Sequence, residues 1–240
     1  MDRKTLDAAL DTLTASLNEL TGLSAAAVLY GSAARGDWVP GRSDVNFLLL
    51  LDDTSSAALL RLTPAVKEWH TKGFAPPLIM GREEWVRSAD VFPIEITDMQ
   101  LSHRMLCGID PVQGVAVDPS DLREAVEKEL RGKLVRLRQA YVRFGDSGQI
   151  LGGFAVASIS TYFAMLRCLA VLSHKTPGKT ATETAASLAA ELGGDAEVAV
   201  EIAKHRVDPE WHCPPDKFVS YLELVRLTVE LVDNFQQGVR

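Results

Sequence analysis

The sequence has 240 residues, of which 47% are apolar and 24% are charged, a composition typical of a compact soluble protein and not of a disordered or fibrous one. Lys and Arg total 25 against 32 Asp and Glu, and the net charge of −7 argues against nucleic acid as the main partner. No apolar run approaches the ~18 residues of a membrane helix, and the start Met-Asp-Arg-Lys does not resemble a signal peptide. We therefore expect no membrane partner and a cytoplasmic location.

The chain opens with a helical pattern that two apolar strand patterns follow. Apolar residues at spacings of three and four predict a first helix that ends at Gly22, with its buried stripe formed by Leu6, Ala9, Leu10, Leu13, Leu17 and Leu20. Apolar runs over 25–30 and 45–51 predict buried strands. The glycines and the proline between them predict a turn and a loop over 33–42.

Three further elements are predicted before residue 118. Ser55 or Ser56 is suited to cap a helix that runs to about Lys72. A short strand is predicted over 77–80 and a longer one over 91–99. The first part of the chain therefore alternates between helix and strand, which favours a small mixed β-sheet with flanking helices.

From residue 120 onward only the helical period remains. A helix is predicted from about Ser120 to Phe144, and further helices are predicted over 150–173, 180–192, 196–205 and 216–236. The linker is placed at Asp118-Pro119. The predicted fold class is α+β, with a sheet-containing domain over 1–118 and a helical bundle domain over 119–240.

One stretch of polar and glycine residues joins the first two predicted strands. Gly31-Ser32 ends the first strand, and Asp44 and Asn46 stand at the start of the next. A Gly-Ser turn that opens a short helix brings backbone N–H groups and a hydroxyl close to a phosphate. Asp44 and Asn46 lie two apart and so project from one face of the strand, where oxygen ligands can hold Mg²⁺ against that phosphate, with Ser43 adding a hydroxyl.

The predicted strand over 91–99 offers a third carboxylate. Glu95 alternates with Ile94 and Ile96 and emerges on the face opposite to them, whereas Asp98 shares their face. A carboxylate in an apolar strand requires a cation or a hydrogen-bond donor, since burying it alone is costly. Glu95 is therefore the preferred third acid, able to bind metal with Asp44 and to take a proton from an attacking hydroxyl.

Gly31-Ser32, eleven intervening residues and then Asp44-x-Asn46 resemble the signature of the polymerase-beta-like nucleotidyltransferase superfamily, which is Gly-Ser followed after about eleven residues by Asp-x-Asp. Within it, the arrangement is most similar to the aminoglycoside adenylyltransferases of the streptomycin and spectinomycin type, which join such a domain to a C-terminal helical bundle. Their third carboxylate is a strand Glu, which the resemblance assigns to Glu95. The resemblance implies ATP as nucleotide donor and Mg²⁺ as cofactor.

A weaker similarity extends into the helical part. The segment from Lys175 to Lys179 resembles a lysine-bearing loop that meets the nucleotide phosphates in that family. The resemblance assigns this role to Lys179 first and to Lys175 second.

One departure from the family pattern bears on catalysis. Asn46 replaces the second Asp of the motif, and a neutral amide cannot bridge two metal ions as a carboxylate does. The leading hypothesis is an adenylyltransferase-type enzyme that transfers AMP from ATP to a hydroxyl of a small molecule or a protein. The alternative is a catalytically degenerate domain that binds a nucleotide or a protein partner, and a third reading is an antitoxin-like enzyme that modifies a toxin partner.

Overall fold

The structure is a computed structural model that describes residues 3–21, 25–41, 43–208 and 210–235. The chain forms two compact units, Met1–Val117 and Asp118–Arg240. The first contains a four-stranded mixed sheet and the second is helical, and 64% of the described residues are helical. The predicted α+β fold class is confirmed.

The first unit holds four strands and five helices among its described residues. In chain order these are α1 (Arg3–Thr21), β1 (Ala25–Tyr30), α2 (Ser32–Arg35), β2 (Asn46–Leu51), α3 (Ser56–Thr71), β3 (Leu78–Gly81), α4 (Arg82–Arg87), α5 (Pro93–Leu101) and β4 (His103–Cys107). The sheet order is β3-β2-β1-β4; β1 runs antiparallel to β2 and β4, and β2 runs parallel to β3. The register places Tyr30 at the end of β1 opposite Asn46 on β2 and His103 on β4.

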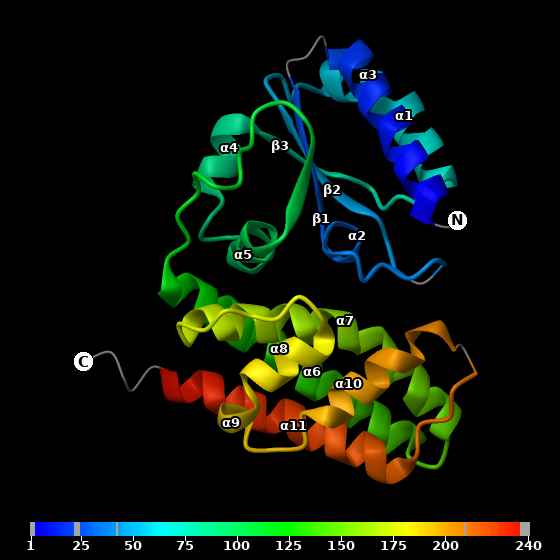
Figure 1. The fold of residues 1–240 in the computed structure, drawn as a ribbon, viewed down its shortest axis with the longest axis vertical. Coiled ribbons are helices and arrows are strands. Elements are labelled where there is room, and N and C mark those ends of the chain that lie inside the picture. Colours follow the sequence, from blue (N-terminus) through cyan, green and yellow to red (C-terminus); the bar gives the residue numbers. More distant parts are fainter. Residues whose placement is uncertain (1–2, 22–24, 42, 209, 236–240) are drawn as a thin grey trace. The chain divides into compact units, whose positions relative to one another are not determined.

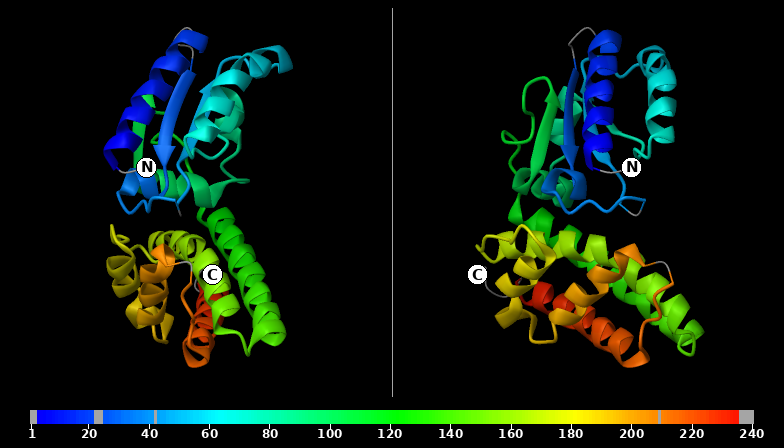
Figure 2. Two further views of the ribbon diagram at one scale, coloured as in Figure 1. Left: turned by 90° about the vertical axis from the view of Figure 1, so that its right-hand side faces the viewer. Right: turned by 45° about the vertical axis from the view of Figure 1, so that its right-hand side comes forward.

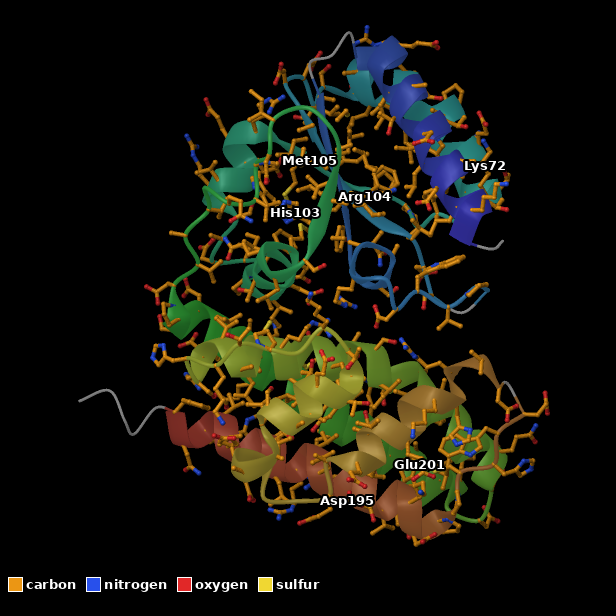
Figure 3. The ribbon with its side chains drawn as sticks, in the orientation of Figure 1. Lys72, His103, Arg104, Met105, Asp195 and Glu201 are labelled. Carbon is orange, nitrogen blue, oxygen red and sulfur yellow. The ribbon has the colours of Figure 1, made fainter. Side chains whose placement is uncertain are left out.

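Helices cover both faces of this sheet, with α1 and α3 on one face and α4 and α5 on the other (Figure 1). The alternation of side chains along β2 explains the two cores. Phe47 and Leu49 pack with α1 and α3, whereas Leu48 and Leu50 pack with α4 and α5. The same alternation is visible on β4, where Arg104 points toward α1 and its neighbours His103 and Met105 point to the opposite side (Figure 3).

Most of the predicted elements of this unit are confirmed. The helix α1 buries the predicted stripe from Leu6 to Leu17, while the Leu20 side chain and Gly22 lie outside the described residues. The strands β1, β2 and β3 agree with the apolar runs, and Ser55 caps α3 by accepting a hydrogen bond from the Ala58 N–H at 3.3 Å.

The predicted strand over 91–99 is wrong, because residues 93–101 form the helix α5. The β-branched residues there favour a strand locally. Pro93 instead occupies the first helical turn, where its fixed φ suits a helix, and Ile96 and Met99, three apart, bury one helical stripe on the sheet. The strand that follows is β4, which the sequence patterns did not predict, and neither did they predict α4.

The second unit is helical in all of its described regular elements (Figure 2). These are α6 (Pro119–Phe144), α7 (Gly148–Leu172), α8 (Ala181–Ser187), α9 (Ala189–Leu192), α10 (Glu197–Lys204), a 3₁₀ turn η1 (His205–Val207) and α11 (Pro215–Asn234). The helix predicted over 180–192 is divided at Leu188 into α8 and α9. Asp118 caps α6 by accepting a hydrogen bond from the Ser120 N–H at 2.8 Å, just before Pro119.

The helix α7 is the core helix of this unit. By length and composition α7 is long and apolar enough to cross a membrane, and it is the one helix among the described residues of which this is true. More than half of its most apolar window, 56%, is buried inside the protein. Apolar helices of soluble proteins that pack on every side pass the same test, and α7 contacts α6, α8, α10 and α11.

Candidate functional site

The turn after β1 depends on Gly31. Its φ of 73° lies in the left-handed region, which glycine adopts without the steric cost that a side chain brings. The Gly31 carbonyl accepts the Arg35 N–H at 3.1 Å, which closes the single helical turn α2, and Gly36 ends that turn at φ 94°. A Cβ built on Gly31 would lie 3.4 Å from Asn46 Nδ2, so the turn and the start of β2 are immediate neighbours.

Asp44 and Asn46 lie beside this turn. Val45 between them is fully buried in the core with α1 and α3, so the alternation of an extended chain directs Asp44 and Asn46 to the opposite face. Asp44 is exposed and Asn46 is half-buried. Within the described parts of the chain, no hydrogen bond or ion pair engages the side chains of Asp44, Asn46 or Ser32. These three polar groups are therefore available to a ligand.

Ser43 has a different environment from the one predicted. Its Oγ accepts a hydrogen bond from the Val39 N–H at 3.1 Å, and its backbone carbonyl accepts one from Trp38 Nε1 at 2.8 Å. The Ser43 N–H in turn donates to the Val39 carbonyl at 2.9 Å. Ser43 thus closes the loop between α2 and β2 and sets the position of Asp44, the next residue.

Glu95 approaches this end of the sheet from a helix. It is exposed in the first turn of α5, on the sheet face that Asn46 shares. The pKa of Tyr30, opposite Asn46, is raised to about 12 by burial of the phenol and then by the negative charges of Glu95 and Asp98. Both acids therefore act on the same group, and the prediction that they lie on opposite faces is wrong, since three residues along a helix return to one side.

Asp98 is held by a cation and is not open to solvent. The Arg35 guanidinium lies 3.0 Å from one Asp98 carboxylate oxygen and 3.4 Å from Asp37, and the Asp98 side chain is only 11% exposed. This ion pair ties α5 to the turn that follows β1. Asp98 is the acid that the sequence analysis placed second to Glu95. Tyr30 is the residue of this region that the sequence patterns did not assign, and its signal was a polar hydroxyl at the last position of an apolar strand, directly before Gly31.

His103 also belongs to this sheet face, but both of its ring nitrogens are engaged. Nδ1 lies 2.8 Å from the Met99 carbonyl at the end of α5, and Nε2 lies 3.0 Å from Asp110 (Figure 3). Burial opposes ionisation of Asp110, but hydrogen bonds from the Val112 N–H and from His103 lower the pKa of that carboxyl overall. His103 therefore fastens α5 and the segment after β4 to the sheet.

Lys175 and Lys179 belong to the helical unit, in the segment between α7 and α8. The Lys175 ammonium donates to the Ser187 carbonyl at 3.1 Å and is paired with Glu191, and this hydrogen bond lowers the pKa of Glu191. Lys179 is exposed; its backbone N–H donates to the Glu183 carboxylate at 2.8 Å, and no residue that the structure describes pairs with its ammonium. Of the two lysines, Lys179 has the ammonium that is available to a ligand.

The donor set suits a cation that arrives with a nucleotide. Asp44 and Glu95 are exposed carboxylates, and Asn46 adds an amide oxygen. In the described ranges, no group of three or more His, Cys, Asp or Glu side chains is placed to hold a metal ion. Mg²⁺ is commonly held by one or two carboxylates together with substrate phosphates and water, and these residues fit that kind of site.

The first unit thus has a mixed sheet with a Gly-Ser turn at the end of β1 and polar residues at the start of its antiparallel neighbour β2. Residues 10–96 match a family model described as nucleotidyltransferase domain. The matched segment runs from α1 into α5 and includes Gly31, Asp44 and Glu95. This supports nucleotidyl transfer as the general chemistry, a nucleotide as substrate and a place in the polymerase-beta-like superfamily. No curated protein matches the chain.

Proposed function

We propose that the protein is an adenylyltransferase-type enzyme that transfers AMP from ATP to a hydroxyl group of a small molecule or a protein. The observation that carries the proposal is the juxtaposition of Gly31 with Asn46, beside Asp44 and Ser32, whose side chains have no described partner. Polar groups at the end of a sheet that do not serve the fold are suited to serve a ligand.

Each residue has a role in this proposal. The Gly31-Ser32 turn places backbone N–H groups and the Ser32 hydroxyl against the triphosphate. Asp44 and Glu95 would hold Mg²⁺, and that ion would supply positive charge to the phosphates. Lys179 is the phosphate contact proposed from the helical unit, with Lys175 second because Glu191 already pairs with it.

The transfer step is an in-line displacement. The acceptor oxygen forms a bond to the α-phosphorus, the bond from that phosphorus to the bridging oxygen breaks, and pyrophosphate leaves. Glu95 accepts the proton of the acceptor hydroxyl, because Glu95 is exposed to solvent whereas the Asp98 side chain is only 11% exposed. We also propose that the protein is cytoplasmic. Its proposed domains are a nucleotidyltransferase-like domain over 1–118 and a helical bundle domain over 119–240.

The test is calorimetric titration of ATP into the protein with and without Mg²⁺. We expect Mg²⁺-dependent binding that weakens at least about tenfold in Asp44→Ala, since one of two metal-binding carboxylates is lost. Asp11→Ala removes the same charge from an exposed position on α1 and is expected to bind like the parent. Absence of ATP binding in either condition, or equal weakening in both variants, would refute the nucleotide site.

Asn46 favours a second candidate, a binding module without turnover. Asn46 offers a neutral amide at the position where the resemblance expects the second carboxylate of a two-metal site, and a Cβ added at Gly31 would lie 3.4 Å from that amide. The variant Asn46→Asp separates the two candidates, with pyrophosphate release in the presence of candidate hydroxyl acceptors as the readout. If the parent binds ATP with Mg²⁺ but only the Asn46→Asp variant releases pyrophosphate, the parent is a binding module. If the parent releases pyrophosphate and the variant does so more slowly, the Asn46 amide is part of a working site.

A further inference from the structure

A groove in the helical unit lies between α6 and α7, within one compact body. It encloses 410 Å³, inside the range of about 300–1,000 Å³ typical of small-molecule sites. Its α6 side carries Lys133, Arg136 and Arg143, spaced at three and seven residues along one face. Its α7 side carries Phe154, Ser158 and Thr161. Arg143 lies ten positions after Lys133, which corresponds to a rise of about 15 Å along α6.

Lys133 forms the polar end of the groove. Lys133 is only 3% exposed, and its ammonium donates to the Ser158 carbonyl at 2.8 Å and to Thr161 Oγ1 at 2.7 Å. An ammonium has three N–H donors, so one remains after these two bonds. Burial, and then the charge of Arg136, lower the pKa of Lys133 to about 8, whereas Glu129 acts in the opposite direction. At neutral pH this buried group is therefore mostly a cation.

The other end of the groove is aromatic. Phe144 and Phe154 stack with ring centroids 6.1 Å apart, and the Arg143 guanidinium lies 4.9 Å from the Phe144 centroid. Phe154 is 41% exposed, so its ring is accessible from the groove. Leu137, Ala140 and Ala157 add apolar surface between the two ends. An aromatic or aliphatic body can bury area there.

The cations of this groove form no direct ion pair in the described chain, although the charge of Glu129 acts on Lys133. The three cations of the groove are accompanied by no Asp or Glu among the described lining residues, and no ion pair joins Lys133, Arg136 or Arg143 to a carboxylate in the described chain. This concentration of positive charge occurs in a protein whose net charge is −7. A buried cation without a counterion is costly, and a bound anion would relieve that cost.

We propose that the groove between α6 and α7 binds a small amphiphilic anion, with a carboxylate or phosphate group at Lys133 and Arg136 and an apolar or aromatic body toward Phe154. This binding site is separate from the proposed nucleotidyl transfer and does not depend on it. Electrostatic and charge-assisted hydrogen bonds select the anion, and the apolar surface selects its body.

The probe is 1-naphthylacetate, and its neutral amide, 1-naphthylacetamide, is the matched control. In calorimetric titrations at pH 7 we expect saturable binding of the carboxylate, at least about tenfold tighter than the amide because only the carboxylate accepts charge-assisted bonds. Inorganic phosphate alone is expected to bind more weakly than the carboxylate probe, because it lacks an apolar body. Equal binding of the two naphthyl compounds, or of phosphate and the carboxylate, would overturn the proposal.

Two pairs of variants locate the site. Arg136→Gln removes a cation from the groove and is expected to weaken binding of the probe at least about fivefold. Its control, Arg138→Gln, removes the same charge from an exposed position of α6 outside the groove and should leave binding within about twofold.

Phe154→Ala removes the aromatic ring from the groove and is expected to weaken binding about fivefold or more. Its control, Val142→Ala, lies at an exposed position outside the groove and should leave binding unchanged. All four positions are exposed, so their substitution spares the core.

The proposal fails if both arginine variants weaken binding equally, because the probe would then sense only the general field of α6. It also fails if a single-stranded oligouridylate binds with the same dependence on Arg136 while the naphthyl carboxylate does not bind. In that case the cations serve a nucleic acid backbone.

Discussion

The polar side chains of the helical core and those at the motif end of the sheet differ in whether the protein supplies their partners. In the helical unit, buried polar groups bond to one another: Tyr162 to Thr228 at 2.8 Å, and Lys133 to Ser158 and Thr161. At the motif end of the α/β unit, Asp44 and Asn46 have no partner in the described chain. Satisfied polar groups specify packing, and unsatisfied ones at a sheet end indicate a ligand. The groove at Lys133 is intermediate, because its ammonium is only partly satisfied.

The largest effect is expected at Lys133 and concerns pH. Its pKa is about 8 in the folded protein against 10.5 for the free side chain, so between these values the unfolded chain binds more protons than the folded one. The free energy of unfolding should therefore rise as pH increases through this window, by up to about 3 kcal/mol. The measurement is urea unfolding at pH 7 to 10, expressed as the difference between the parent and Lys133→Met.

The matched control is Lys128→Met, which removes a lysine from an exposed position of α6. A Lys133→Met difference that changes with pH no more than the Lys128→Met difference would mean that the Lys133 ammonium is solvated and that the helical unit does not bury a charge.

The next effect is expected at Gly31. Gly31→Ala forces a side chain into φ 73° and places a Cβ against Asn46, at a cost of about 1–2 kcal/mol in stability, together with loss of Mg²⁺-dependent ATP binding. Gly41→Ala is the control, because φ is 72° there and no atom lies within 4 Å of the new Cβ. It should show similar strain and retain ATP binding. Equal loss of ATP binding in both variants would show that the Gly31 turn has no specific role in binding ATP.

A smaller effect is expected at Tyr162, whose hydroxyl is fully buried. Thr228 Oγ1 donates to the Leu224 carbonyl, so the Tyr162 hydroxyl donates to Thr228. Tyr162→Phe leaves that acceptor unmatched and should lower the free energy of unfolding by about 1 kcal/mol. The comparison is with Tyr141→Phe, whose hydroxyl bonds to no other described residue, measured by thermal unfolding. Equal melting temperatures of the two variants would show that the buried bond adds nothing.

The smallest effect is expected in the titration of Tyr30. Because burial is the main cause of its raised pKa and the charges of Glu95 and Asp98 add to it, Glu95→Gln should lower the pKa of Tyr30 only part of the way from about 12. The measurement is the ¹³C chemical shift of the Tyr30 phenol against pH. Glu83→Gln, at an exposed position of α4, is the control. If the pKa of Tyr30 is the same in Glu95→Gln as in the parent, the Glu95 carboxylate does not lie near Tyr30 at this end of the sheet.

Local patterns in the sequence were sufficient for the elements whose apolar period is unambiguous. The stripe of α1, the apolar runs of β1 and β2, and the Ser55 cap each depend on residues close in the chain, so a single pass along the sequence finds them. The spacing from Gly31-Ser32 to Asp44 and Asn46 is likewise local, since a strand, a turn and a strand bring them together.

Tertiary structure decided what local patterns could not. The β-branched residues of 93–101 favour a strand in isolation, but burial of Ile96 and Met99 on the sheet makes the segment a helix, and this brings Glu95 and Asp98 to one side of Tyr30. Likewise, Lys175 and Glu191 pair across sixteen residues, and Lys133 meets α7 through packing. The sequence by itself determined the motif and the fold class, because both follow from short-range periodicity, whereas long-range packing determined which charges are held by partners and which remain for a ligand.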